Sequence, residues 1–245
     1  MRIISVVPSL TELVYDLGLE SQLVGITRFC IHPQPNVKRI TKVGGTKTLN
    51  IDRIIDLTPD LIIANKEENS KEDIEKLQRH CNVWVTEINT LNEALTVITE
   101  LGIKANVVKK ATLLVTFIKS NFKSLARISN VQKSVAYLIW EDPIMVAGKN
   151  TFINEMIHSM GLKNILTDPL SRYPIYNPME LENLQPDLIF LSSEPYPFKK
   201  KHLEKYQHQF PKSQIVLVDG EMFSWYGSRM KLAPSYFKQL LHELI

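Results

Sequence analysis

The residues of this 245-residue chain that could do chemistry are scattered, and they do not form a known catalytic signature. The six His residues lack the two-histidine spacing of a zinc-protease helix, and the glycines do not form a nucleotide-binding loop. Gly148-Lys149-Asn150-Thr151 resembles the end of a phosphate loop, but the upstream glycine is missing and a helix cap explains Thr151. These patterns argue against a nucleotide site and against a preformed zinc site.

Aromatic residues are more informative, because seven of them fall in expected loops or at strand ends rather than along helical core stripes. They are Phe29, Trp140, Tyr173, Tyr176, Phe223, Trp225 and Tyr226. Each alone is more often a packing residue than a binding residue, but together they mark segments that would face a cleft between two α/β lobes. Such a cleft suits a large, flat or hydrophobic ligand. His32, in a proline-rich loop, is the one His that we expect near a ligand, although an ordinary loop position is the more frequent role.

The elements that must position these residues are organised around a long helix expected over residues 103–128. Its apolar residues recur at the i, i+3, i+4, i+7 spacing of one helical face, with lysines opposite. A helix end, a Leu-x-Pro-Asp turn and an apolar strand occur before it at Ile55–Ala64 and again after it at Glu182–Leu191. The proline ends a helix, and the apolar run suits a strand of a parallel sheet. We therefore predict two similar lobes, residues 1–102 and 129–245, joined by this helix.

Capping signals predict where individual helices begin. Ser9 with Glu12 three residues later has the pattern of a capping box, which predicts a helix from Leu10 onward. Asn150 or Thr151 is expected to cap a later helix. Every expected strand alternates with a helix, which implies an α/β fold with mostly parallel sheets.

Composition excludes several classes of function. The chain is 44% hydrophobic and 22% charged, as in soluble globular proteins, and its net charge of +3 is too small to indicate nucleic-acid binding. No apolar stretch approaches the roughly 20 residues needed to cross a bilayer. The N-terminus runs directly into an expected strand without the regions of a signal peptide, so either the chain is cytoplasmic or a leader is absent. Cys30 and Cys81 are too few for a metal motif, and we expect buried free thiols, with a disulfide only in an oxidising compartment.

Several segments occur in an order that is specific as a set. They are Ile4–Glu12, Val24–Thr27, Val43–Gly45, Leu57–Ile62, the long helix, Ala147–Thr151 and Asp219–Arg229. This order resembles the helical-backbone substrate-binding proteins, which serve ABC importers of cobalamin, ferric siderophores and haem. The resemblance covers nearly the whole chain and is strongest to the cobalamin-binding branch. It implies two Rossmann-like lobes, one rigid connecting helix, and a ligand held in the cleft with little hinge closure.

The resemblance also implies which residues bind the ligand. In the cobalamin binders the contacts come from segments that match Arg28–His32, Gly44–Lys47, Tyr173 and Glu221–Arg229. Thr46 stands where family members commonly carry a tryptophan, so one stacking platform is missing here. The candidate ligand-binding residues are Phe29, His32, Thr46, Trp140, Tyr173, Trp225, Tyr226 and Arg229.

The family also places one exposed acid on each lobe, where it meets arginines of the permease. Asp52 occupies this position in the first lobe, while in the second lobe it is occupied by Met179, with Glu180 one residue further on. Both acids also lie in expected first helical turns, where a carboxylate is favourable in any case. Asp52 and Glu180 are therefore candidates for docking a permease.

The resemblance implies a monomeric, extracytoplasmic protein without catalytic activity, resident metal or required cofactor. It would capture a corrinoid such as cobalamin, or another metal chelate, and deliver it to an ABC importer permease. The alternative within the fold is a ferric-siderophore or haem receptor, in which Arg28, Lys47 and Arg229 meet anionic groups. An alternative from another class is a cytoplasmic metal-handling protein or enzyme built on paired α/β lobes.

Overall fold

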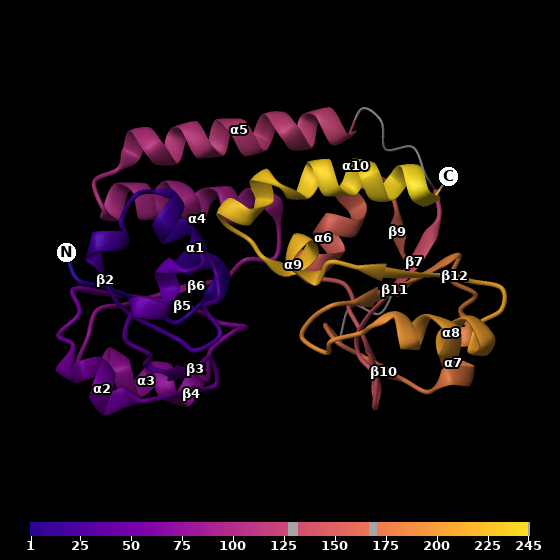
Figure 1. The fold of residues 1–245 in the computed structure, drawn as a ribbon, viewed down its shortest axis with the longest axis horizontal. Coiled ribbons are helices and arrows are strands. Elements are labelled where there is room, and N and C mark those ends of the chain that lie inside the picture. Colours follow the sequence, from indigo (N-terminus) through magenta and orange to yellow (C-terminus); the bar gives the residue numbers. More distant parts are fainter. Residues whose placement is uncertain (127–131, 167–170, 245) are drawn as a thin grey trace. The chain divides into compact units, whose positions relative to one another are not determined.

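The computed structural model describes residues 1–126, 132–166 and 171–244, and residue contacts divide the chain into two compact units (Figure 1). The first unit comprises Met1–Ile88, Asn92–Phe117 and Tyr226–Met230, and the second comprises Asn89–Leu91, Ile118–Trp225 and Lys231–Ile245. The short segment Tyr226–Met230 thus packs with the first unit, although the chain on both sides of it belongs to the second.

The first unit is built on a four-stranded parallel sheet in the order β2-β1-β5-β6. Its strands are β1 (Ile3–Ser5), β2 (Leu23–Ile26), β5 (Leu61–Asn65) and β6 (Val83–Thr86). β1 and β5 are buried along their whole length, as central strands of a sheet covered on both faces should be. The strand predicted after the first Leu-x-Pro-Asp turn is confirmed as β5.

Helices cover both faces of this sheet, with α1 and α4 on one side and α2 and α3 on the other (Figure 1). The helices are α1 (Pro8–Asp16), α2 (Ile51–Asp56), α3 (Lys71–Gln78) and α4 (Leu91–Lys104), and a hairpin of β3 (Gly44–Gly45) and β4 (Thr48–Leu49) precedes α2. Ile54, Ile74 and Leu77 of α2 and α3 pack in one core cluster with the sheet. The apolar stripes of α2 and α3 are therefore buried against the sheet.

The capping box predicted at Ser9 and Glu12 is wrong. α1 begins at Pro8, its N-cap is Val7, and no side chain accepts a capping hydrogen bond there. Because proline is well suited to the first helical position, it places Ser9 inside the helix. The Glu12 side chain instead pairs with Arg229.

The long helix α5 spans Val108–Ala126 rather than 103–128. Ile103 belongs to α4, which ends at Lys104, and Asn106 has a φ of 56°. That left-handed conformation interrupts a right-handed helix, and residues 127 and 128 lie outside the described residues.

The predicted apolar face of α5 is confirmed in part, since Val108 at its start is 49% exposed. Ala111, Ile118, Phe122 and Leu125 are all buried. The division into units falls within this helix, between Phe117 and Ile118.

The second unit contains a mixed sheet in the order β10-β8-β7-β11-β12, with β9 beside β7. Its strands are β7 (Ser134–Trp140), β8 (Ile144–Val146), β9 (Lys163–Asn164), β10 (Ile175–Tyr176), β11 (Leu188–Ser192) and β12 (Gln214–Val218). β7, β11 and β12 run parallel, and Leu188 pairs with Val135 on one side and Gln214 on the other. β9 is also parallel to β7, whereas β8 and β10 are antiparallel, so the prediction of mostly parallel sheets holds for β7, β9, β11 and β12 but not for β8 and β10.

The helices of the second unit also lie on both faces of its sheet (Figure 1). They are α6 (Phe152–Ser159), α7 (Pro178–Asn183), α8 (Lys200–Gln209), α9 (Gly220–Ser224) and α10 (Ala233–Leu244). Phe223 is fully buried, with its ring centre 5.1 Å from Tyr137 and 4.8 Å from Phe237. The expectation that Phe223 lines a cleft is therefore wrong, because its ring completes an aromatic core. Within the described residues, no helix combines the length and apolar character needed to span a membrane.

Candidate functional site

The carboxyl ends of the parallel strands are where side chains able to meet a ligand gather in α/β folds. In the first unit, Phe29 follows β2 and its side chain is 49% exposed. The Arg28 guanidinium carbon lies 5.1 Å from the centre of the Phe29 ring, and the Arg28 N–H donates to the Gly44 carbonyl at 2.9 Å. A Cβ atom on Gly45 would come within 3.3 Å of the Phe29 ring. The loop after β2 and the β3–β4 hairpin therefore pack closely and present one face of Phe29 outward.

A buried amide joins this hairpin to the sheet. The Asn69 Nδ2 atom donates to the carbonyls of Val6 and Thr46, each at 3.0 Å. Asn69 Oδ1 accepts from the Asn65 N–H at 2.8 Å. The half-buried Thr46 is thus held at the carboxyl end of the sheet by a residue that sequence reasoning missed. The signal for it was an asparagine in the short loop after β5, four residues beyond the end of that strand, where asparagine side chains commonly bond the backbone.

A polar cluster fixes the loop that carries His32. The Thr11 Oγ1 atom lies 2.8 Å from Ser5 Oγ and 3.1 Å from Cys30 Sγ, and Thr27 Oγ1 lies 3.2 Å from the same sulfur. Burial raises the pKa of the Cys30 thiol, so this thiol is neutral and structural. Both cysteines are free, as predicted, although Cys81 is half-buried rather than buried.

Arg229 is buried in the first unit and bound to α1. Its Nε atom donates to Glu12 Oε2 at 2.8 Å, and the two side chains are 9% and 13% exposed. Burial raises the pKa of Glu12, while the hydrogen bond and charge of Arg229 and the charge of His32 act in the opposite direction. The neighbouring Tyr226 is only 4% exposed. This contact holds the Tyr226–Met230 segment on the first unit, and it links residues 217 positions apart.

In the second unit, Trp140 ends β7 with 40% of its surface exposed. Its ring centre lies 5.6 Å from that of Tyr196. The next residue, Glu141, accepts hydrogen bonds from the Tyr196 hydroxyl and from Lys205 Nζ. Burial tends to raise the pKa of Glu141, but these hydrogen bonds outweigh it and lower the pKa. The cluster supports Trp140 at the carboxyl end of the sheet.

Trp225 is only 7% exposed and ends α9. Its Nε1 atom donates to Glu194 Oε1 at 2.8 Å, and Ser224 Oγ donates to the same oxygen at 2.6 Å. Tyr173 is half-buried in the segment before β10, next to Arg172, whose carbonyl accepts from the Gly148 N–H at 2.7 Å. Sequence reasoning did not find Glu194, because nothing near it in the sequence indicates its partners on α9.

The structure thus distributes the candidates between the two units. Phe29, His32, Thr46, Tyr226 and Arg229 belong to the first, and Trp140, Tyr173 and Trp225 belong to the second. Within the part of the chain that the structure describes, no group of three or more His, Cys, Asp or Glu side chains is arranged to hold a metal ion.

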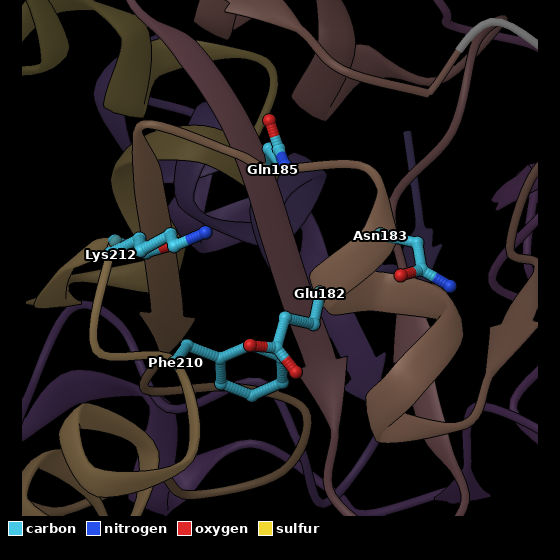
Figure 2. A pocket seen from close by; sticks show the side chains of 6 residues that line it. Glu182, Asn183, Gln185, Phe210 and Lys212 are labelled. Carbon is cyan, nitrogen blue, oxygen red and sulfur yellow. The ribbon is translucent and has the colours of Figure 1, made fainter.

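A pocket of about 270 Å³ in the second unit contains none of these candidates. Figure 2 shows the side chains of Glu182, Asn183, Gln185, Phe210 and Lys212 that line it. Gln185 precedes β11 and Lys212 precedes β12. The pocket therefore lies at the amino-terminal ends of these strands, opposite to Trp140 and Glu194.

The two candidate docking acids are both exposed, in the first turns of α2 and α7. Glu180 takes part in a capping box, with its Oε2 atom accepting from the Asn177 N–H at 2.8 Å. The Asp52 side chain is not needed to cap its helix, because Asn50 caps α2.

The periplasmic binding protein family model matches residues 3–210 of the chain. The chain is 33% identical over 177 residues to an uncharacterised ABC transporter substrate-binding lipoprotein of Bacillus subtilis, a match that covers 68% of this chain and 56% of that protein. The chain thus spans little more than half the length of that relative. It is 22% identical over 237 residues to a vitamin B12-binding protein of Pectobacterium carotovorum, which covers 95% of this chain and 85% of the relative.

Solved structures agree over nearly the full chain. The periplasmic vitamin B12 binding protein of Vibrio cholerae superimposes with a TM-score of 0.85 and 25% identity, covering 99% of this chain and 96% of that one. A periplasmic haem-binding protein of Roseiflexus has a TM-score of 0.84 at 20% identity, covering 99% and 98%. The second likeness concerns the fold alone.

Proposed function

The chain belongs to the periplasmic binding protein family, and we propose that it is the substrate-binding component of an ABC importer for a corrinoid or related metal chelate. The observation that carries this proposal is a pair of exposed aromatic rings. Phe29 lies in the loop after β2, at the carboxyl end of the first sheet. Trp140 is the last residue of β7, at the carboxyl end of the strand in the second sheet. Exposed rings held by packed loops suit a large ligand with apolar faces.

The partners of the basic residues favour a neutral ligand such as a corrinoid over an anionic one. The Arg28 side chain lies over Phe29, Lys47 Nζ donates to the Glu67 carbonyl, and Arg229 is paired with Glu12. A siderophore or haem carboxylate would have to compete with these existing contacts. The named B12-binding relatives support the same ligand class.

The proposal includes an extracytoplasmic location and a monomeric protein that docks a permease through Asp52 and Glu180, without a catalytic step. Titrations with cyanocobalamin, haemin and a ferric siderophore, followed by absorbance and calorimetry, test the ligand class. We expect saturable one-to-one binding of cyanocobalamin and weaker binding of the other two. Tight binding of haemin without binding of cyanocobalamin would show that the ligand is a haem and not a corrinoid.

A further inference from the structure

In the loop after β11, one oxygen of the Glu194 carboxylate is fixed by hydrogen bonds, and the other has no hydrogen-bond partner among the described residues. We infer that Glu194 is a specificity residue, which holds the Trp225 indole in place and offers a hydrogen-bond acceptor to a neutral, amide-bearing ligand. This inference rests on the proposed function, because it assigns the ligand class of that same site.

The first oxygen, Oε1, is fixed by two donors. Ser224 Oγ lies at 2.6 Å and Trp225 Nε1 at 2.8 Å, and both donors come from the end of α9. Hydrogen bonds to an ionised acceptor are stronger than those between neutral groups, so the pair fixes both the carboxylate and the indole.

Gly220 makes this approach possible. A Cβ atom at position 220 would come within 2.6 Å of Glu194 Cγ. The glycine at the start of α9 therefore lets Glu194 lie directly against the helix that carries Trp225.

The second oxygen, Oε2, makes no hydrogen bond to any of the described residues. This oxygen is not fully enclosed by the protein, and Glu194 as a whole is half-buried. Glu194 follows the carboxyl end of β11, at the edge of a parallel sheet where ligands bind. An ionised oxygen there accepts hydrogen bonds only, so it selects donors.

The local charge adds to this preference. After burial, which is the largest cause, the charges of Glu221 and Asp219 also raise the pKa of Glu194, so two acids lie near its carboxylate. A ligand carboxylate placed there would be repelled by all three acids, whereas a neutral amide would donate to Oε2. The peripheral amides of a corrinoid are such donors, and the propionates of haem are not. Rejection of an anion by like charge is an effective source of specificity.

The central test compares Glu194→Gln with the parent protein on two probes. The probes are cyanocobalamin and a cobalamin monocarboxylic acid, in which one side-chain amide is hydrolysed. The glutamine carbonyl can still accept from Ser224 and Trp225, but its NH₂ group turns the free acceptor into a donor. We expect the parent to prefer cyanocobalamin, and the substitution to reduce that preference by roughly tenfold, as for a lost hydrogen bond to a charged group.

Glu182→Gln is the matched control, because it makes the same charge change on an exposed residue at the opposite end of the same sheet. It should leave both affinities within about twofold of the parent. An unchanged preference in Glu194→Gln would overturn the inference alone. A parent that binds neither corrinoid would overturn the proposed function, and with it the ligand class assigned here.

The positioning of Trp225 is tested without ligand. Replacing Trp84 and Trp140 with Phe leaves Trp225 as the single tryptophan of the three. In that background Glu194→Ala should shift the emission to longer wavelength and increase acrylamide quenching, while Glu194→Gln should change neither. Equal spectra and quenching for all three proteins would show that Glu194 does not hold the indole.

Discussion

Arg229 was a candidate for binding ligand anions, but its Nε atom donates to the largely buried carboxylate of Glu12. Removing one member of a buried pair leaves the other charge uncompensated, which commonly costs several kcal/mol. We predict that Arg229→Ala lowers the free energy of unfolding by about 3 kcal/mol, measured by urea denaturation. The double variant Arg229→Ala with Glu12→Gln should recover part of this loss. No recovery would show that the guanidinium acts through packing rather than through the ion pair.

The same pair predicts a dependence on pH. The folded-state pKa of Glu12 is raised by burial, and Arg229 opposes that rise. A raised carboxyl pKa contributes stability below the unfolded-state pKa and loses it as the pH rises through the folded-state pKa. Without Arg229 the pKa rises further, so the cost of Arg229→Ala should be larger near pH 7 than near pH 5. Unfolding curves of parent and variant at both pH values check this, and an equal cost would contradict it.

Phe29 and Trp140 are 49% and 40% exposed, whereas Trp225 is buried. We therefore expect stacking on Phe29 and Trp140 to contribute more to ligand binding than stacking on Trp225. We predict that Phe29→Ala and Trp140→Ala each cost about 1–3 kcal/mol of binding free energy, as aromatic anchors do. Calorimetric titration with the confirmed ligand measures this. Leu113→Ala, which truncates an apolar side chain 63% exposed on α5, is the control. Full affinity in both aromatic variants would exclude these rings as contacts.

Glu194 predicts opposite effects of acid on affinity and on stability. Burial raises its pKa, so protonation on acidification begins at a higher pH than for an ordinary glutamate. Protonation at the unpartnered Oε2 converts an acceptor into a donor, so cyanocobalamin affinity should fall as the pH falls through this pKa. The contribution of Glu194 to stability rises over the same range, because its folded-state pKa is the higher one. Affinity measured against pH should fall in the parent and be flatter in Glu194→Gln.

At the scale of elements, the sequence predicted what local chemistry determines. The apolar strands after both Leu-x-Pro-Asp turns are present as β5 and β11, and Thr151 caps α6 as expected. The prediction failed at Ser9, where the preference of proline for the first helical position moved the start of the helix. The start of α5 was also missed, because the left-handed residue Asn106 separates two helices that share one apolar pattern.

The candidate site was less predictable than the fold. Residue type and loop position identified the exposed Phe29 and Trp140. The partners of Arg229 and Trp225 come from distant segments, 217 and 31 positions away along the chain. Such pairings depend on the topology of the folded chain and leave no periodic trace in the sequence.

The cap of α6 gives a prediction at this scale. Thr151 Oγ1 accepts from the Asn154 N–H at 3.1 Å and donates to the Gly148 carbonyl at 2.8 Å. We predict that Thr151→Ala lowers the free energy of unfolding by about 1–2 kcal/mol, since an N-cap is lost. Ser70→Ala at the N-cap of α3 is the matched control, because the Ser70 side chain makes no capping hydrogen bond. Equal losses in the two variants would contradict this assignment.

At the scale of the whole molecule, the fold does not distinguish between ligands. Solved B12-binding and haem-binding proteins match the chain almost equally well, with TM-scores of 0.85 and 0.84. A shared fold carries different specificities through the side chains placed on it. The discriminating features must therefore be residues such as Glu194 and the paired basic residues.

The proposed docking to a permease would involve exposed residues outside the ligand site, and of the two candidate acids Asp52 is the better one to test. It is exposed in the first turn of α2, while Glu180 also closes a capping box, so a substitution of Glu180 would weaken α7 as well. We predict that Asp52→Lys weakens complex formation with the cognate permease and leaves ligand affinity unchanged. Asp56→Lys is the matched control, with the same charge change on an exposed residue at the other end of the same helix.

A pull-down at low and high salt measures the effect of Asp52→Lys. Exposed ion pairs are screened beyond about 8–10 Å near physiological ionic strength, so the difference between Asp52→Lys and the parent should shrink as salt increases. A general effect of net charge would instead lower the yield of both lysine variants equally. If Asp52→Lys and the parent give the same yield at low salt, the carboxylate serves only the start of α2, where it interacts favourably with the helix dipole.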